Sequence, residues 1–300
     1  MLPSKPATPA PSAASPAPTA YDAIYGMRKA TTSLLGQERK AGMAVNPSRT
    51  ILAVSYPTEY HIRVFRAPLF GFERVFGKKG KAAAAFMHIS RICFASDDVL
   101  LIADIGNDRV QSVTITGTIL RSFKVKQPAS LAVHGDLVAV GTVPGPIEIH
   151  SLSTGRLIRS FGARGTKPGL IGDGASGLRF SPDGARLLVA EFSNHRLSMF
   201  TTAGTFIQNI GVGLFKNGFK DVEFTAAGDI IACDQQDCSI RVFSPDGNTL
   251  VKEWKTFNAD FGGPDSNFCF PNAIAMVGST FYVMDDSELY VFKSTRAEKK

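Results

Sequence analysis

Short hydrophobic segments recur along most of the chain, and within them apolar and polar residues alternate with a period of two. This alternation is typical of β-strands with one buried face, and glycine-containing turns separate the segments. Over residues 21–292 we find no segment with the 3.6-residue period of an amphipathic helix. The pattern therefore predicts an all-β domain over residues 21–292.

The segments form a repeat of four strands. A short apolar strand and a second strand that ends in a small or acidic residue precede a third strand rich in Val, Ile and Phe. A fourth strand follows a Gly-containing turn. The residues that close the second strands are spaced by 46 positions on average, which is typical of the four-stranded blades of a β-propeller. These residues are Ser55, Asp104, Gly141, Glu191, Asp234 and Asp285.

Six units are present, and the strand bounds follow from the alternation. Third strands are expected at residues 61–65, 109–113, 146–150, 196–200, 240–243 and 289–292, and fourth strands at 72–77, 119–123, 157–162, 206–211 and 249–254. The sixth unit stops after its third strand. Residues 31–36 end in Leu-Gly, much as several fourth strands end in Phe-Gly, so we expect them to pair with the strand at 288–292 and close the ring. Closure removes exposed sheet edges.

Two units carry a motif of their own. Residues 103–111 read ADIGNDRVQ and residues 190–197 read AEFSNHRL. This pattern resembles the NHL repeat, and the resemblance over residues 30–292 implies a six-bladed propeller like that of TRIM-NHL proteins. The chain has no CxxC pair, so neither a RING nor a B-box is expected. WD40 repeats are the alternative fold: residues 180–184 and 243–247 both read FSPDG, but the single Trp254 is not followed by Asp.

The repeated polar positions have a structural interpretation. A carboxylate at a strand end can accept hydrogen bonds from the next turn and pair with a nearby arginine. We expect this role, in blade after blade, at Asp104, Arg109, Glu191, Arg196, Asp234 and Asp285. The alternative is a ring of carboxylates that binds calcium at the axis, as the resemblance to propeller lactonases implies.

The ends of the chain differ from the domain in composition. Residues 1–20 are rich in Pro, Ala and Ser, which predicts a disordered arm, and residues 293–300 form a short charged tail. The net charge is +7, of which only +1 comes from residues 41–292.

No apolar run is long enough to cross a bilayer. The four cysteines have neither zinc-finger nor disulfide-framework spacing, so we expect a reduced, cytoplasmic protein.

Propeller topology sorts the charges onto two faces. Loops from the fourth strand of one blade to the first strand of the next emerge on the same face as the loops between second and third strands. Nine basic residues lie in these fourth-to-first loops, with Asp173 and Asp221 nearby: Lys78, Lys79, Lys81, Lys124, Lys126, Arg164, Lys167, Lys216 and Lys220. Aspartates dominate the loops of the opposite face, at Asp97, Asp98, Asp136, Asp183, Asp229 and Asp246.

The basic face is a candidate binding surface. We expect a non-catalytic scaffold that binds a protein partner, with single-stranded RNA as the alternative that the resemblance to TRIM-NHL propellers implies. Six aromatic residues in or beside the same loops could stack on bases or belong to the core: Tyr56, Tyr60, Phe86, Phe192, Phe215 and Phe219.

Catalysis is the less favoured class. NHL-like amidating lyases hold a metal with several histidines, but His61, His150 and His195 fall in or beside third strands, and His88 and His134 belong to different blades. No nucleophile elbow, Walker loop or dinucleotide fingerprint occurs. We therefore expect no metal and no cofactor, and a metal-dependent lyase or lactonase is the second alternative.

Overall fold

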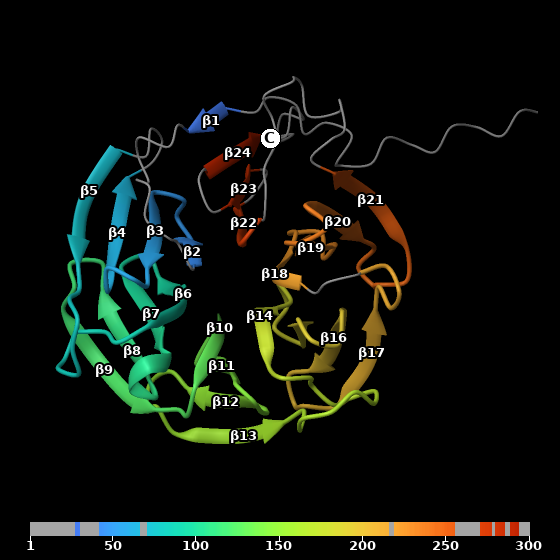
Figure 1. Cartoon of the computed structure of the whole chain (residues 1–300), viewed down its shortest axis with the longest axis horizontal. Coiled ribbons are helices and arrows are strands. Elements are labelled where there is room, and N and C mark those ends of the chain that lie inside the picture. The colour runs from blue at the N-terminus through green and yellow to red at the C-terminus, as the bar shows by residue number, and fades with distance from the viewer. Residues whose placement is uncertain are drawn as a thin grey trace, which may run out of the picture.

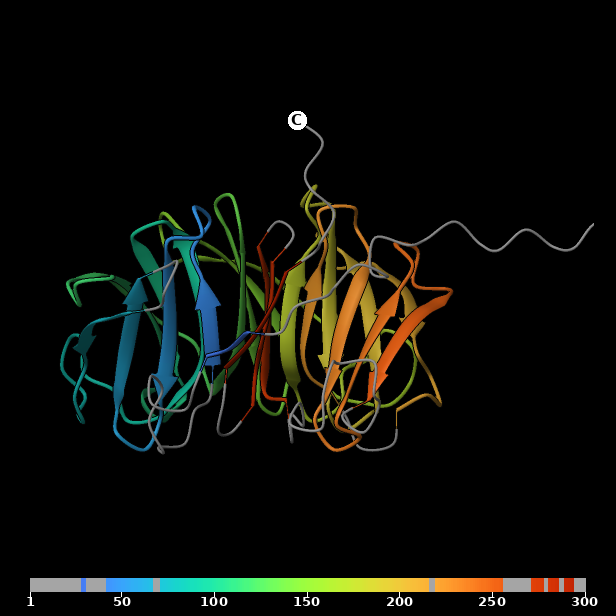
Figure 2. The same ribbon diagram turned by 90° about the horizontal axis from the view of Figure 1, so that it is seen from above.

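The structure is a computed structural model that describes residues 28–30, 42–66, 71–215, 219–255, 271–277, 280–285 and 289–293. In these residues the strands form six four-stranded antiparallel sheets around a central axis (Figure 1). Each sheet is one blade, and its strands run between the two rims of the ring (Figure 2). The predicted fold class, an all-β six-bladed propeller, is confirmed.

Each of the first five blades uses four consecutive strands, which we name a to d from the axis outward. Blade 1 contains β2 (Gly42–Val45), β3 (Ile51–Tyr56), β4 (His61–Arg66) and β5 (Gly71–Phe76). Blade 2 contains β6 (Ile89–Ser96), β7 (Val99–Asp104), β8 (Arg109–Thr114) and β9 (Ile119–Lys124), with a 3-10 turn, η1 (Ile105–Asn107), between b and c. Blade 3 contains β10 (Pro128–His134), β11 (Leu137–Thr142), β12 (Ile147–Ser151) and β13 (Leu157–Phe161).

The last blades continue the series. Blade 4 contains β14 (Ala175–Phe180), β15 (Arg186–Glu191), β16 (Arg196–Thr201) and β17 (Phe206–Ile210). Blade 5 contains β18 (Phe219–Phe224), β19 (Ile230–Asp234), β20 (Ser239–Phe243) and β21 (Leu250–Lys255). Blade 6 contains β22 (Ala273–Val277), β23 (Thr280–Met284) and β24 (Leu289–Lys293). The c strands of all six blades and the d strands of the first five lie within one residue of the predicted bounds.

The sixth blade takes its outer strand from the N-terminal part of the chain. β1 (Arg28–Ala30) pairs antiparallel with β24, with Arg28 opposite Val291 and Ala30 opposite Leu289. The sequence assigned this position to residues 31–36, which lie outside the described residues, so closure by that segment is not confirmed. The predicted arm at residues 1–20 and most of the tail at 293–300 also lie outside them, although Lys293 belongs to β24.

The core lies between blades. The middle strands face a neighbouring blade on each side, so β3, β19 and β20 are buried along their whole length, whereas the outer strand β5 is largely exposed. One hydrophobic cluster joins Ile62 and Val64 of blade 1 to Ile92 and Ile102 of blade 2. Burial on both faces explains why these strands are nearly continuous hydrophobic runs.

A β-bulge recurs near the start of four inner strands. The register shifts between Ile89 and Arg91, Pro128 and Ser130, Ala175 and Gly177, and Phe219 and Asp221. A bulge leaves one residue outside the regular ladder and re-aims the side chains beside it. Ser90 and Ser176 are two such residues, and each hydroxyl donates a hydrogen bond to the next blade, to Pro128 O and Phe219 O respectively.

Candidate functional site

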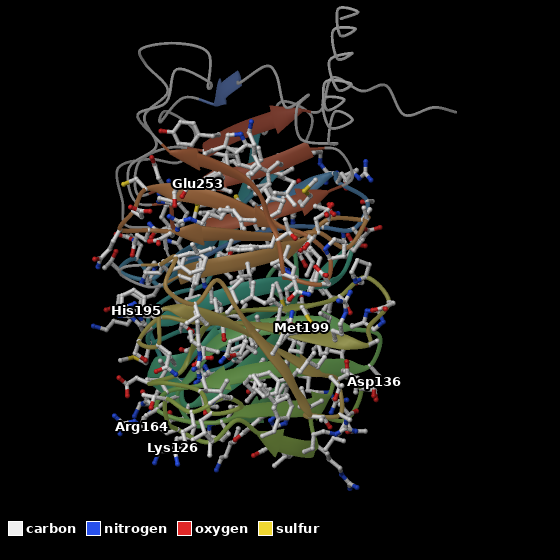
Figure 3. The ribbon with its side chains drawn as sticks, turned by 90° about the vertical axis from the view of Figure 1, so that its right-hand side faces the viewer. Lys126, Asp136, Arg164, His195, Met199 and Glu253 are labelled. Atoms are coloured by element: carbon white, nitrogen blue, oxygen red, sulfur yellow. The ribbon has the colours of Figure 1, made fainter. Side chains whose placement is uncertain are left out.

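The d–a loops, which join strand d of one blade to strand a of the next, carry the predicted basic residues. Figure 3 shows Lys126 and Arg164 at one edge of the ring and Asp136 at the opposite edge. Within the described residues, seven of the nine side chains are exposed and form what we call the basic rim: Lys78, Lys79, Lys81, Lys124, Lys126, Arg164 and Lys167. Lys220 is half-buried, and Lys216 lies outside the described residues.

A buried ion pair in blade 2 holds the d–a loop of residues 77–88. Asp104 accepts a hydrogen bond from the Met87 amide at 3.0 Å and from Arg109 Nε at 3.0 Å. Arg109 in turn donates to three loop carbonyls, those of Lys81, Ala82 and Ala85. We call this arrangement, a carboxylate and an arginine that together bind one loop, a loop clamp. It fixes the backbone that presents Lys78, Lys79 and Lys81.

Blade 4 repeats the loop clamp on the d–a loop of residues 162–174. Glu191 accepts from the Gly172 amide at 3.1 Å and from Arg196 Nε at 3.0 Å. Arg196 donates to the carbonyls of Thr166, Lys167 and Leu170. Both carboxylates are fully buried, and Arg196 is almost so. The NHL-like motif residues therefore bind backbone rather than an outside ligand.

Blades 5 and 6 use other side chains at the same position. The buried Asp234 pairs with Arg241 at 3.2 Å, although the motif places the arginine two residues earlier, at Ser239. Arg241 lies on the same side of β20 as that position, because side chains alternate along a strand. Its guanidinium also lies 4.8 Å from the centre of the Phe215 ring. In blade 6, Tyr290 donates to Asp285 at 3.1 Å.

The aromatic residues of this rim are mostly part of the core. Tyr56, Phe86, Phe215 and Phe219 are at most 5% exposed, so the prediction that they could stack on bases is wrong for these four. They pack between blades, which the sequence also allowed. Phe192, at 37% exposed, and the half-buried Tyr60 remain accessible, and each has an ammonium group over its ring, Lys220 at 5.0 Å and Lys79 at 5.1 Å.

Each acidic side chain described on this rim has a partner. Asp173 forms an exposed pair with Arg164 at 2.6 Å. The b–c loops add Glu59, which accepts from Thr58, and Asp108, which accepts from the Gln127 amide. Asp237 binds Arg241. Asp221, which the sequence placed among these acids, is buried inside the ring and does not offset the charge of the rim.

Five lysines of the basic rim form no hydrogen bond, ion pair or ring contact through their side chains in the part of the chain that the structure describes. They are Lys78, Lys81, Lys124, Lys126 and Lys167. Their ammonium groups are exposed and available to a partner. The rim is therefore a surface of unpaired positive charge, with Lys78, Lys81 and Lys167 on clamped loops and Lys124 and Lys126 at the connection from blade 2 to blade 3.

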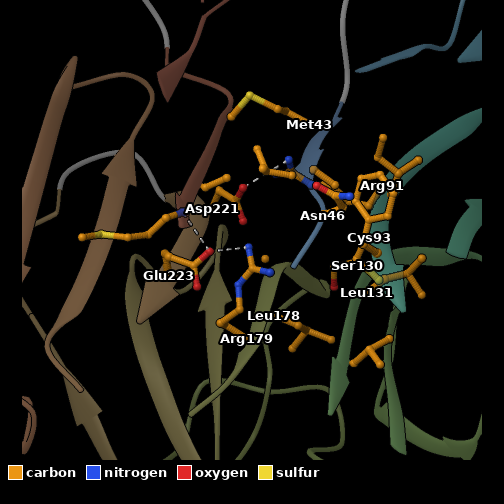
Figure 4. Close-up of a pocket in the computed structure, with 18 of the residues that line it drawn as sticks. Met43, Asn46, Arg91, Cys93, Ser130, Leu131, Leu178, Arg179, Asp221 and Glu223 are labelled. Carbon is orange, nitrogen blue, oxygen red and sulfur yellow. Dashed lines mark hydrogen bonds and ion pairs between the residues drawn. The ribbon is translucent and has the colours of Figure 1, made fainter. Parts of the chain in front are cut away.

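A second candidate site lies on the axis, where the sequence offered only a calcium-binding carboxylate ring as an alternative. A cavity of about 220 Å³ is bounded by residues of all six inner strands. Polar and apolar groups both line it, and the charged side chains in it are Arg91, Arg179, Asp221 and Glu223 (Figure 4). All four lie on inner strands that begin with a bulge, namely β6, β14 and β18.

Arg91 separates the cavity from the basic rim. Its guanidinium crosses the axis from blade 2 and donates to the carbonyls of Ser176, Lys220 and Asn272, which lie at the basic-rim ends of the inner strands of blades 4, 5 and 6. It also lies 3.7 Å from Asp221. The cavity continues past Arg91 toward the opposite rim, since Phe94 and Val133 line it.

The described residues offer no metal site and no membrane-spanning helix. No three His, Cys, Asp or Glu side chains gather there in a way that could hold a metal ion. The His150 ring packs on Phe123 and binds Glu148 at 2.8 Å. No described helix has the length and apolar character needed to cross a membrane.

Comparison with known proteins adds no family. The chain matches no family model, and no curated protein matches it. The fold is therefore established by strand pairing, and membership of the NHL family stays a prediction.

Proposed function

We propose that the protein is a non-catalytic interaction platform that binds an acidic segment of a protein partner on the basic rim. Propellers commonly act as interaction scaffolds, and the observation that supports this use here is the set of five unpaired, exposed lysines on d–a loops. Loops held by loop clamps lose little conformational entropy on binding, which favours affinity.

The structure favours a protein partner over single-stranded RNA. RNA readers combine positive charge with several accessible aromatic rings on which bases stack. Four of the six aromatic residues near this rim are buried, and a lysine lies over the ring of each of the other two. An acidic peptide needs the lysines without the stacking platforms. RNA is therefore the second candidate, supported by the charge alone.

A cytoplasmic location belongs to the same proposal. The three described cysteines, Cys93, Cys233 and Cys238, are free thiols, as expected in a reducing compartment.

A matched pair of charge reversals tests the platform. Lys78→Glu with Lys126→Glu alters two exposed side chains of the basic rim, and Arg49→Glu with Arg156→Glu alters two exposed arginines of the opposite rim by the same net charge. Fluorescence anisotropy with a labelled Glu-rich peptide and with a labelled oligouridine, each at several salt concentrations, compares the two ligand classes. We expect the first variant to lose at least tenfold in peptide affinity and the second to bind as wild type.

The outcomes separate the hypotheses. Equal peptide binding by both variants would remove the basic rim as the site. Tighter binding of oligouridine than of peptide, with a log–log salt slope of about 0.7 per phosphate contacted, would favour RNA. A crosslinking pull-down from native cells, with and without nuclease, then shows whether the retained partner is a protein.

A further inference from the structure

The charged groups of the axial cavity divide into three that the fold uses and one that it leaves open. Asp221 accepts from the Ile274 amide at 3.1 Å, and Glu223 accepts from the Met276 amide at 3.4 Å. The two carboxylates are two residues apart on β18, and the two amides are two residues apart on β22. They thus connect the inner strands of blades 5 and 6. Arg91 binds three backbone carbonyls and Asp221, so it also has a structural role.

Arg179 on β14 is the exception. Its Nη2 lies 3.0 Å from Glu223, and its Nε lies 3.4 Å from Val222 O. Its Nη1 has no hydrogen-bond partner in the described residues, and 28% of the side chain is exposed although it lies inside the ring. Figure 4 shows Arg179 in the wall of the cavity, close to Glu223. The Nη1 nitrogen is therefore available as a donor at the cavity.

The wall also offers apolar contacts to a ligand. Met43, Val45, Leu131, Leu178 and Met276 line the cavity from four different blades. Ser130, on the blade next to Arg179, also lines it, and its buried hydroxyl has no hydrogen-bond partner among the described residues. Ligand sites combine apolar contacts with a few well-placed polar groups, and this wall offers both kinds of group.

The chemistry of Arg179 and the volume of the cavity together define a ligand class. A guanidinium binds a planar carboxylate through two parallel hydrogen bonds, a geometry that matches carboxylate better than a single point charge does. An engineered cavity of about 150 Å³ holds one benzene ring, so a cavity of about 220 Å³ has room for a ring that carries one carboxylate group. Burial raises the pKa of the neighbouring Glu223.

We infer that the axial cavity binds a small monocarboxylate with an apolar body, anchored on Arg179 and entering from the rim opposite the basic rim. The site is independent of the proposed protein-binding surface, because Arg91 lies between the two. A small metabolite could thus occupy the axis while a protein partner binds the basic rim.

Calorimetric titration of the full chain with benzoate tests this inference. We expect one site with a sub-millimolar dissociation constant, and an affinity at least tenfold lower for Arg179→Gln and for Arg179→Lys, which keeps the charge but loses the planar fork. Arg121→Gln is the matched control, since Arg121 is an exposed outer-strand arginine with one backbone hydrogen bond, to Thr154 O. Its affinity should equal that of wild type.

A second variant keeps the test valid if Arg179 variants fail to fold. Val45→Phe adds bulk to the cavity wall from blade 1 without altering Arg179, and we expect it to weaken benzoate binding at least tenfold. The inference is overturned if wild type binds none of benzoate, phenylacetate and hexanoate at up to about 10 mM. It is also overturned if benzylamine or inorganic phosphate binds as tightly as benzoate, or if both Val45→Phe and a folded Arg179 variant bind like wild type.

Discussion

The two rims of the propeller use their charges in opposite ways. On the rim opposite the basic rim, Asp183 and Asp246 accept hydrogen bonds from the serine hydroxyls and backbone amides of their own short turns, and Asp136 accepts them from Ser151 and Ser153 in the neighbouring c–d turn. On the basic rim, the buried Asp104 and Glu191 each bind an arginine that holds a d–a loop, and five exposed lysines have no partner in the described residues. Three aspartates of one rim are therefore engaged in hydrogen bonds, whereas five lysines of the basic rim are available.

The largest expected effect comes from breaking a loop clamp. Glu191→Ala leaves the guanidinium of Arg196 buried without its carboxylate, so we expect the free energy of unfolding to fall by about 3–5 kcal/mol. Chemical denaturation measures it. Arg164→Ala, which removes an exposed ion pair on the same loop, should cost about 1 kcal/mol or less. Equal losses would show that the clamp is no more important than a surface pair.

A smaller effect is expected from the backbone of the clamped loop. Gly162 has a φ of +72°, and a Cβ added there would lie 2.6 Å from Ile171 Cγ1. Gly162→Ala should therefore destabilise the fold by about 1–3 kcal/mol through left-handed strain and overpacking. Gly71→Ala is the control, because a Cβ at Gly71 meets nothing within 4 Å. If thermal denaturation shows the same midpoint for both variants, the loop adapts and its shape is not fixed by this turn.

The smallest effect concerns the aspartate turns and appears only in acid. Hydrogen bonds from Ser151, Ser181 and Ser244 are the main cause of the lowered pKa values of Asp136, Asp183 and Asp246. A lowered pKa in the folded state means that the unfolded state binds more protons. The contribution to stability is then complete above the unfolded value of about 3.9 and is lost as the pH falls through the folded values.

Removing the three hydroxyls tests this contribution. With Ser151→Ala, Ser181→Ala and Ser244→Ala combined, the free energy of unfolding should decline less steeply between pH 5 and about pH 2.5 than in wild type. Ser122→Ala with Ser160→Ala alters two exposed outer-strand serines and should leave the slope unchanged. An unchanged slope in the triple variant would mean that the serine hydroxyls do not stabilise the ionised aspartates. The contrast between the rims would then disappear.

Prediction from sequence succeeded for the strands and failed where side chains reach across the ring. The six c strands and the d strands of the first five blades matched their predicted bounds to within one residue, because alternation is a local property of the chain. The clamp arginine of blade 5 was not identified, because Arg241 reaches Asp234 from the next position on the same side of β20. The aromatic residues were left open between core and surface, and only packing between blades decided that four of them are buried.

By itself, the sequence determined the strand pattern, the number of blades and the loops that carry the lysines, because each depends on residues close together in the chain. Only the tertiary structure decided which charges are engaged. Arg91 binds carbonyls 85, 129 and 181 residues away, and those distances along the chain carry no local pattern. The same is true of Arg179, whose partners lie on the next blade. The partners of a long side chain depend on which groups lie near it in three dimensions. Ring closure brings those partners within reach.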